Sequence, residues 1–230
     1  MKNVNGVEVF SSLVEIVDPA HTALLVIDVQ NDGIRTDGWF ARNGKDVTAA
    51  AAILPRLVAL VQAARDAGVL PVFIQQTTLP SNHSDSPAWL YFKTRDGRTR
   101  TDYELDGTWG HQLVDELNVS PDDITVRKFR PSAFHGTSLD ALLKANGIRS
   151  VVTCGVITQG CVQATTMDAS FHDYYTVLVQ DCVAGYTPAL HDNALTFLES
   201  RYDAVTGEQL AALWAGAGES ASRVEDAAHA

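Results

Sequence analysis

The fold is decided by the stretch VVTCGVITQGCVQATTMD, which occupies residues 151–168. It starts with an apolar, β-branched run that ends at Gly155, continues through a short polar turn, and ends in small residues without Gly or Pro. This pattern predicts a strand, a turn and a helix in succession. The stretch is therefore the unit around which we interpret the rest of the chain.

Cys161 stands at the start of the predicted helix. The first N–H groups of a helix have no helical partner and its dipole favours negative charge there, so we expect the Cys161 thiol to lose its proton below the free value of about 8.5. The same N–H groups are able to receive a developing oxyanion. Cys161 is therefore a candidate nucleophile, with a candidate oxyanion site in the same turn.

Length, charge and cysteine content narrow the class of protein. The chain has 230 residues, enough for one well-packed α/β domain and short for two. Its net charge of −11 argues against nucleic acid or an anionic membrane as a partner, because both require clustered positive charge. We find no signal peptide and no apolar run of the roughly 18 residues that span a bilayer. The odd number of cysteines, without metal-ligand spacing, predicts a reducing cytoplasm.

Strands and helices alternate along the chain, which predicts one doubly wound, three-layer α/β domain with about six mainly parallel strands. Besides the strand that ends at Gly155, apolar runs predict strands at 23–29, 69–75, 124–126, 175–181 and 202–205. Helical spacing and end signals predict helices at 53–67, 109–117, 138–145, 188–199 and 207–214. We assign 20–214 to the domain, 1–19 to an N-terminal extension, and 215–230 to a tail that frays or contacts another subunit.

Two charged residues follow predicted strands at equivalent positions. Asp28 lies at the end of the first buried run, and Lys128 lies at the end of the third. Each alone has an ordinary explanation, as a loop-capping acid or a surface lysine. In open α/β sheets, however, ligands bind outside the carboxyl ends of the strands, so Asp28, Lys128 and Cys161 would meet at one crevice if their strands are neighbours.

Two loops are candidates for the walls of that crevice. The loop at 30–45 carries Trp39 and Phe40, and the irregular segment at 77–108 carries Trp89. Long irregular loops in compact domains are usually lids or binding loops. His83 and Asp85 are spaced closely enough to suggest a metal, but no second His lies near them, so we expect none.

Three ordered motifs resemble the isochorismatase-like cysteine hydrolases. They are VIDVQND at 26–32, the Lys128 segment with SAF and TSL at 132–139, and GVITQGCV at 155–162. Within that family, GTWG at 107–110 and GCVQAT at 160–165 are most similar to the N-carbamoylsarcosine amidase branch.

The resemblance implies a six-stranded parallel sheet and a catalytic triad of Asp28, Lys128 and Cys161. It also implies a cis peptide bond between Val156 and Ile157, with the Ile157 and Cys161 N–H groups as the oxyanion hole. Family members are commonly dimers or tetramers, so we expect a homodimer or homotetramer. No cofactor is implied.

The chain departs from the family pattern at two places. Metal-binding relatives carry Asp-x-His after the second strand, where this chain reads QQTTL at 75–79, so we expect no metal. Amidases of the carbamoylsarcosine branch place Arg where Tyr186 and Gln163 stand here, so sarcosine is a poor candidate substrate. The candidate pocket residues are Trp39, Phe40, Trp89, Phe134, Thr158, Gln159 and Tyr186.

These residues predict an amidohydrolase that cleaves the C–N bond of a small amide or ureido compound through a thioester on Cys161. One alternative is vinyl-ether hydrolysis of the isochorismatase type, which requires Asp28 but no thiol. Another is a non-catalytic binding protein in which the three residues form a structural ion pair beside a buried thiol. Arg130 is available to bind an anionic group, or it pairs with a surface acid.

Overall fold

A six-stranded parallel sheet with the order β5-β4-β3-β6-β7-β8 forms the centre of the molecule. The computed structural model describes residues 1–95, 97 and 101–228. The strands are β3 (Thr22–Ile27), β4 (Leu70–Gln76), β5 (Ile124–Lys128), β6 (Ser150–Val156), β7 (Tyr175–Ala184) and β8 (Asp203–Val205). This is the predicted α/β class, with each predicted strand present to within a few residues.

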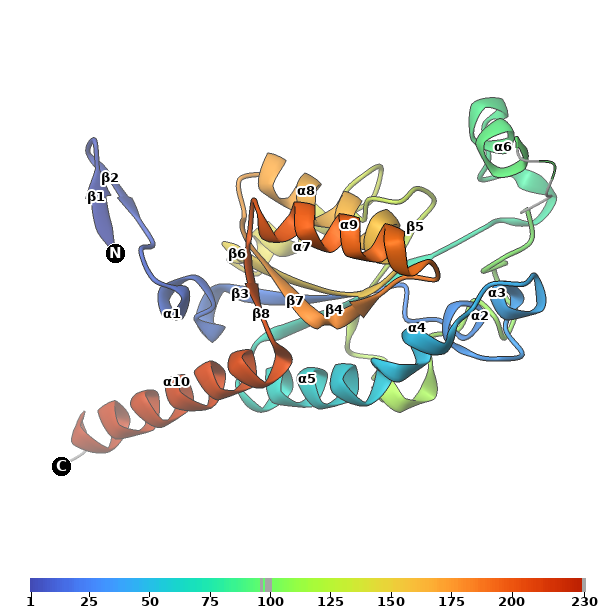
Figure 1. Cartoon of the computed structure of the whole chain (residues 1–230). Helices are drawn as coiled ribbons and strands as arrows, with labels where there is room; N and C mark the ends of the chain where they lie inside the picture. The colour runs from blue at the N-terminus through green and yellow to red at the C-terminus, as the bar shows by residue number, and fades with distance from the viewer. Residues whose placement is uncertain (96, 98–100, 229–230) are drawn as a thin grey trace.

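Helices cover both faces of the sheet (Figure 1). One face carries α5 (Leu54–Asp66) and α10 (Gly207–Ala228), and the other carries α7 (Leu139–Ala145), α8 (Gln163–Phe171) and α9 (Pro188–Glu199). β3 contributes Leu24 and Val26 to the first hydrophobic cluster and Leu25 and Ile27 to the second. A strand that is buried on both faces needs apolar side chains at successive positions, which explains the continuous apolar run before Asp28.

Strand register brings the carboxyl ends of four strands together. Ile27 of β3 pairs with Ile74 of β4 and with Gly155 of β6, and Gln76 of β4 pairs with Lys128 of β5. Gly155 has a φ of 113°, and a Cβ there would lie 2.1 Å from the Ile27 carbonyl oxygen. Because only glycine fits this close approach, Gly155 allows β6 to continue past β3 into the turn that carries Cys161.

The predicted helix at 109–117 is wrong. The structure has turns there, followed by a short 3₁₀ helix at Asp115–Leu117. The segment bonds across to the loop after β3 instead, because the Asp32 N–H donates to the Gly110 carbonyl and the Val114 N–H to the Val29 carbonyl. These long-range bonds replace the local bonds that a helix would need.

The loop predicted at 77–108 contains a helix that the sequence reading missed, α6 (Pro87–Thr94). The Ser86 hydroxyl caps it by accepting a hydrogen bond from the Trp89 N–H, and Pro87 occupies its first turn. Its buried residue is Lys93 rather than an apolar one, so no amphipathic pattern marks it. In Figure 1 it lies well away from the sheet, beyond the carboxyl ends of the strands.

Both ends of the chain carry structure that was not predicted. A hairpin of β1 (Lys2–Val4) and β2 (Val7–Val9) turns at Asn5-Gly6, where both residues have positive φ. Asn-Gly is a strong hairpin signal, so the sequence did contain this information. The tail from residue 215 onward, expected either to fray or to contact another subunit, continues α10 to Ala228 and projects past the sheet (Figure 1).

The remaining α-helices are short. They are α1 (Leu13–Ile16), α2 (Asn31–Ile34), α3 (Trp39–Arg42) and α4 (Thr48–Ala52). The last of them, α4, is separated from α5 by a single residue. By length and composition, the stretch Thr48–Asp66 is apolar enough to cross a membrane. Here its apolar side has a partner within the domain, because Leu57, Leu60 and Val61 are buried in the first core cluster.

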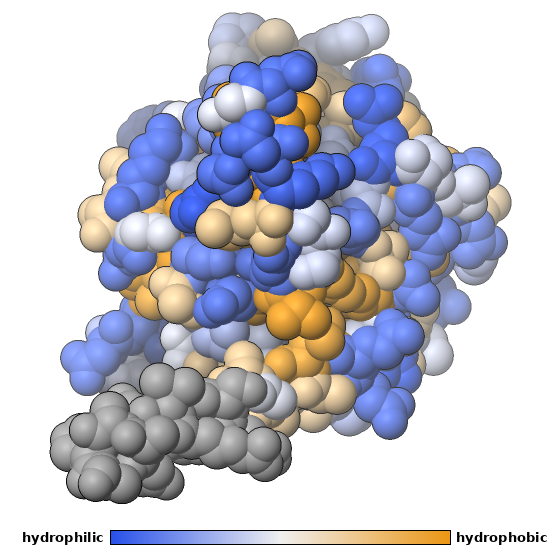
Figure 2. Space-filling model, turned by 90° about the vertical axis from the view of Figure 1, so that its left-hand side faces the viewer, coloured by the Kyte–Doolittle hydropathy of each residue, from blue (hydrophilic) through white to orange (hydrophobic). Residues whose placement is uncertain are grey.

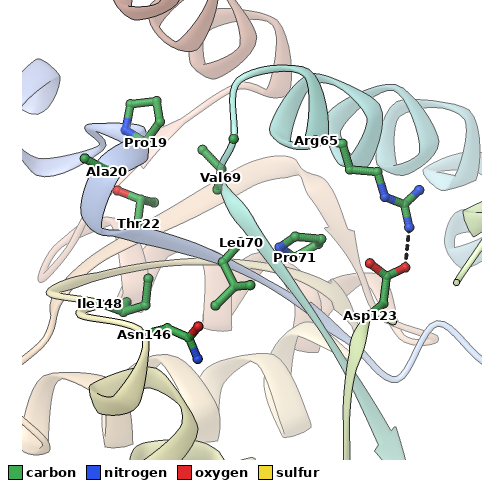
Figure 3. Close-up of a pocket in the computed structure, with 11 residues that line it drawn as sticks. Pro19, Ala20, Thr22, Arg65, Val69, Leu70, Pro71, Asp123, Asn146 and Ile148 are labelled. Atoms are coloured by element: carbon green, nitrogen blue, oxygen red, sulfur yellow. Dashed lines mark hydrogen bonds and ion pairs between the residues drawn. The ribbon is translucent and has the colours of Figure 1, made fainter. Parts of the chain in front are cut away.

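A pocket of about 480 Å³ lies at the amino ends of the strands, the end of the molecule seen in Figure 2. Thr22 and Leu70 line it from the first residues of β3 and β4, and Ile148 lines it from just before β6 (Figure 3). An ion pair of 2.6 Å between Arg65 and Asp123 spans one side. The surface seen in Figure 2 is largely hydrophilic, with a group of apolar residues below its centre. This pocket is at the opposite end of the sheet from Asp28, Lys128 and Cys161.

Candidate active site

The structure brings Asp28, Lys128 and Cys161 together. Asp28 directly follows β3, Lys128 ends β5, and Cys161 lies in the helical turn Thr158–Val162 after β6. The Lys128 ammonium nitrogen is 2.8 Å from Asp28 Oδ2 and donates a hydrogen bond of 3.1 Å to Cys161 Sγ. The convergence inferred from strand ends alone is therefore present.

The Lys128 ammonium is fully buried and has more acceptors than hydrogens. Besides Asp28 and Cys161, it lies 2.9 Å from Gln76 Oε1 and 3.3 Å from the Arg130 carbonyl oxygen. Burial alone would lower the pKa of Lys128, but the charge of Asp28 and the Cys161 sulfur outweigh burial and raise the pKa above its usual value. Lys128 is thus a permanent cation between a carboxylate and a thiol.

Asp28 is held in place by its own backbone conformation and by a backbone N–H of β4. Its φ of 53° lies in the left-handed region, which Asp tolerates better than most residues and which turns the chain out of the strand. Its Oδ1 accepts a hydrogen bond of 2.9 Å from the Gln76 N–H. Gln76 therefore contacts both charges, with its backbone on Asp28 and its side chain on Lys128. The sequence reading missed this role, because Gln76 looked like an ordinary strand end.

The expected depression of the Cys161 pKa is wrong. Burial and the charge of Asp28 raise the pKa of the thiol above its usual value, and Lys128 only partly opposes them. The turn at Thr158–Val162 is also wider than an α-helix, and regular α8 starts after Cys161. The thiol therefore stays protonated near neutrality and needs a base to remove its proton during a reaction.

The peptide bond between Val156 and Ile157 is cis, as the family resemblance implied. It immediately precedes the turn that carries Cys161. The Thr158 side chain is completely buried, and its hydroxyl oxygen lies 2.8 Å from His191 Nδ1. The Gln159 side-chain oxygen is buried, has no hydrogen-bond partner among the described residues, and lies against Gly185, where a Cβ would be 2.4 Å away.

Four aromatic rings form a cluster, and three of them, Trp39, Phe40 and Tyr186, belong to predicted pocket residues. Phe40 lies 5.2 Å from Trp39, 5.3 Å from Tyr103 and 5.1 Å from Tyr186, measured between ring centroids. The Tyr186 hydroxyl donates to the Gly33 carbonyl. Burial first, and then nearby acidic groups that include Glu104 and Asp28, raise the pKa values of both Tyr103 and Tyr186. The cluster is therefore within electrostatic range of the triad.

Two other predicted pocket residues lie elsewhere. Trp89 stacks on Phe92, and the Arg130 guanidinium lies 4.9 Å above the Trp89 ring. Arg130 thus contacts a predicted wall residue and donates to the backbone carbonyls of Ser84 and Phe129, and within the described part of the chain it pairs with no acid. Phe134 stacks on His172 and belongs to the core cluster on the α7–α9 face, so the structure does not bring it to the aromatic cluster.

Glu104 is a further residue of the site that sequence reasoning missed. Its side chain is buried, and its pKa is raised well above the usual range by burial and then by the charge of Asp28. The Glu104 N–H donates to Asp32 Oδ2 at 2.7 Å, and the Trp39 N–H donates to Asp32 Oδ1 at 2.9 Å. Asp32 therefore ties the two loops together. Gly110 makes room for it, since a Cβ there would lie 2.2 Å from Asp32 Oδ1.

Across residues 1–95, 97 and 101–228, no group of three or more His, Cys, Asp and Glu side chains is placed to hold a metal ion. Asp85, which together with His83 has the close spacing of a metal-binding pair, forms an ion pair of 2.9 Å with the buried ammonium of Lys93. Directly after β4, the Thr77 hydroxyl lies 2.9 Å from His111 Nε2.

A parallel α/β sheet that presents an Asp, a Lys and a Cys from three strand ends defines the class to which the motifs pointed, the cysteine hydrolases. Residues 22–209 match the isochorismatase domain family, and the chain belongs to this family.

Known relatives agree with this assignment. The ureidoacrylate amidohydrolase RutB of Methylobacterium radiotolerans is 33% identical over 194 residues, which cover 80% of this chain and 75% of the relative. The N-carbamoylsarcosine amidase of Thermoplasma acidophilum superposes with a TM-score of 0.64 at 25% identity, covering 81% of this chain and 96% of that one. The pyrazinamidase of Pyrococcus horikoshii, solved in complex with zinc, gives 0.67 at 29% identity over 81% and 99% of the two chains.

Proposed function

We propose that this protein is a cysteine-dependent amidohydrolase that cleaves a C–N bond of a small ureido or carbamoyl compound. Membership of the isochorismatase family and the similarity to ureidoacrylate amidohydrolases and an N-carbamoylsarcosine amidase support this reaction class. The single observation that carries the proposal is the Lys128 ammonium within hydrogen-bond distance of both the Asp28 carboxylate and the Cys161 thiol.

In the first step, Asp28 removes the proton from Cys161 as the sulfur attacks the substrate carbonyl carbon. The raised pKa of the thiol makes this base necessary. Lys128 remains charged and stabilises first the carboxylate and then the forming thiolate. The negative charge that develops on the carbonyl oxygen rests on the Ile157 and Cys161 N–H groups, and one such donor is worth roughly 3 kcal/mol.

In the second step, the protonated Asp28 donates its proton to the leaving nitrogen, and the C–N bond breaks. Ammonia or an amine departs, leaving the acyl or carbamoyl group on Cys161 as a thioester. Asp28, now ionised again, takes a proton from water as the water attacks this carbonyl. The C–S bond then breaks, and the protonated Asp28 returns its proton to the Cys161 thiolate, which restores the enzyme.

The aromatic cluster and Glu104 are the proposed substrate-binding side of the site. Trp39, Phe40 and Tyr186 supply flat apolar surface, while burial and the charge of Asp28 raise the pKa of Glu104, which favours the neutral form of its carboxyl group. A neutral carboxyl group both donates and accepts hydrogen bonds, as a ureido group also does. This matches the planar, uncharged carbamoyl end of such substrates.

Setting and assembly extend this proposal. The three cysteines are unpaired, which supports a reducing cytoplasm as the site of action.

Exposed apolar side chains support a homodimer or homotetramer that covers them. They are Tyr91 and Phe92 on α6, and Trp109.

The test is ammonia release from a panel of amides, ureides and N-carbamoyl amino acids, with Cys161→Ala as the matched control. We expect at least one ureido or carbamoyl compound to be hydrolysed by the wild-type chain and none by the variant. Mass spectrometry of the acid-quenched enzyme should show a substrate-derived mass on Cys161. Equal hydrolysis by the variant would reject the thioester route.

A further inference from the structure

The turn that carries Cys161 is anchored from behind by a residue outside the triad. Thr158 is the first residue of that turn and directly follows Ile157. Its side chain is completely buried, and its hydroxyl oxygen lies 2.8 Å from Nδ1 of His191 on α9. A hydroxyl group buried in this way needs a partner, because leaving a buried polar group unpaired destabilises the fold.

His191 is well placed to act as an anchor. It lies in the first turns of α9, which packs on the face of the sheet beneath the Cys161 turn. The loop before α9 is in close contact with the same turn, because a Cβ at Gly185 would lie 2.4 Å from Gln159 Oε1 and 3.3 Å from the His191 Cβ. His191 also lines a surface pocket of about 380 Å³, whose lining includes Arg56 and Asp181 but none of the three triad residues.

We propose that His191 is a positioning residue for the oxyanion side of the active site: through Thr158 it fixes the Ile157 and Cys161 N–H groups without taking part in activation of the thiol. This inference rests on the proposed amidohydrolase function. The Asp28–Lys128–Cys161 contacts are made from the ends of β3 and β5 and by Gln76, whereas the Thr158–His191 contact holds the first residue of the turn that carries Cys161.

The two roles are separable by chemistry. Hydrolysis builds negative charge on a carbonyl oxygen and therefore depends on the oxyanion donors. Alkylation of Cys161 by iodoacetamide displaces iodide at a saturated carbon, so it depends on the thiolate but on no oxyanion site. A residue that positions only the donors should affect the first reaction and leave the second unchanged.

The experiment compares His191→Leu, His191→Asn and Thr158→Val in the full chain, with Asp192→Asn as the control. The control residue is the exposed neighbour of His191 on the same helix. We expect His191→Leu and Thr158→Val each to lower kcat about 10- to 100-fold, less than the 10²- to 10³-fold typical of removing an oxyanion donor itself. KM should change less than about twofold, and the rate and pH profile of Cys161 alkylation should match those of the wild type.

His191→Asn should restore most of kcat, since an Asn amide is able to reach the Thr158 hydroxyl from the position of Nδ1. The double variant His191→Leu/Thr158→Val should be no slower than the slower single variant, because both changes break one contact. Thermal unfolding of each variant checks that the fold is intact.

The inference fails if His191→Leu hydrolyses substrate at the wild-type rate, or if kcat and alkylation fall together, which would indicate a general disturbance. It also fails if Asn at position 191 is as slow as Leu. A wild-type chain that releases ammonia from no member of the panel would overturn the proposed function itself, an outcome that is distinct from a normal wild type with unaffected variants.

Discussion

The two ends of the sheet each hold a cation paired with a carboxylate, and they differ in what surrounds the pair. At the amino end, Arg65 and Asp123 are 2.6 Å apart beside an open pocket, with side chains 23% and 14% exposed. Arg65 also donates to the carbonyls of Leu117 and Asn118, and neither of these backbone groups is chemically reactive.

At the carboxyl end, Lys128 and Asp28 are 2.8 Å apart with exposures of 0% and 5%, and their third partner is a thiol. Removing two charges from water costs several kcal/mol per ion, which a fold recovers only with good geometry and additional hydrogen bonds. The open pocket at the amino end is easy to see, yet the chemistry points to the other end. The lesson is that the burial of reactive groups identifies the site better than the size of a cavity does.

The strongest test of this contrast removes the sulfur. Cys161→Ala should lower turnover by about 10⁴-fold or more, because the nucleophile has no substitute, while the free energy of unfolding changes by less than about 1.5 kcal/mol. Cys161→Ser should be similarly inactive, since a hydroxyl is a far weaker nucleophile. Ammonia release and urea unfolding measure the two quantities. Turnover within tenfold of the wild type would show that the carboxyl end does not work through covalent catalysis.

A second test separates the base from the nucleophile. Asp28→Asn should lower turnover about 10²- to 10⁴-fold, since general acid–base catalysis is lost. The same change should speed alkylation of Cys161 by iodoacetamide near pH 7. The sign follows from the charges: Asp28 raises the pKa of the thiol and Lys128 lowers it, so removing the carboxylate leaves more thiolate at a given pH.

In the wild type, by the same reasoning, alkylation of Cys161 should be slow near neutrality and increase as the pH rises above the usual thiol value of about 8.5. Rapid wild-type alkylation at pH 6, or slower alkylation of Asp28→Asn than of the wild type, would contradict the roles assigned to this pair.

A third test compares the energetic cost of the two ion pairs. Lys128→Met leaves the buried Asp28 carboxylate without its cation, and breaking such a pair typically costs about 3–5 kcal/mol. It should also slow acylation and raise the pKa of Cys161 further, because Lys128 lowers that pKa. Urea unfolding and the pH profile of alkylation measure these effects. The double variant Asp28→Asn/Lys128→Met should regain part of the lost stability, and failure to do so would indicate that the pair is not coupled.

The sequence predicted the sheet and the triad because both depend on local patterns. β3 is an unbroken apolar run that ends in Asp28, and strand ends in a parallel sheet meet at one edge, so Lys128 and Cys161 followed from the same rule. Motif resemblance supplied the cis bond before Ile157. None of these inferences required knowing the path of a loop.

The remainder of the site depends on contacts between segments far apart in the chain. Glu104 is recruited through Asp32, which lies 72 positions earlier, and His191 reaches a threonine 33 positions away. The pKa of Cys161 was predicted from the helix start alone, whereas the structure adds burial and the charge of Asp28, which together reverse the sign. Local patterns cannot report such neighbours, because their distances are set only after the chain has folded.

The smallest effect is expected at the amino end, where Arg65→Met removes the more accessible cation. Partly exposed pairs contribute little, so we expect a loss of less than about 2 kcal/mol in the free energy of unfolding, mostly from the hydrogen bonds to Leu117 and Asn118. Turnover and the alkylation rate of Cys161 should stay within twofold of the wild type, because the sheet separates this pocket from the triad. Asp123→Asn is the matched variant on the other side of the pair. A loss of turnover above tenfold in either variant, with the fold intact, would mean that the amino-end pocket participates in the reaction and that the contrast between the two ends is wrong.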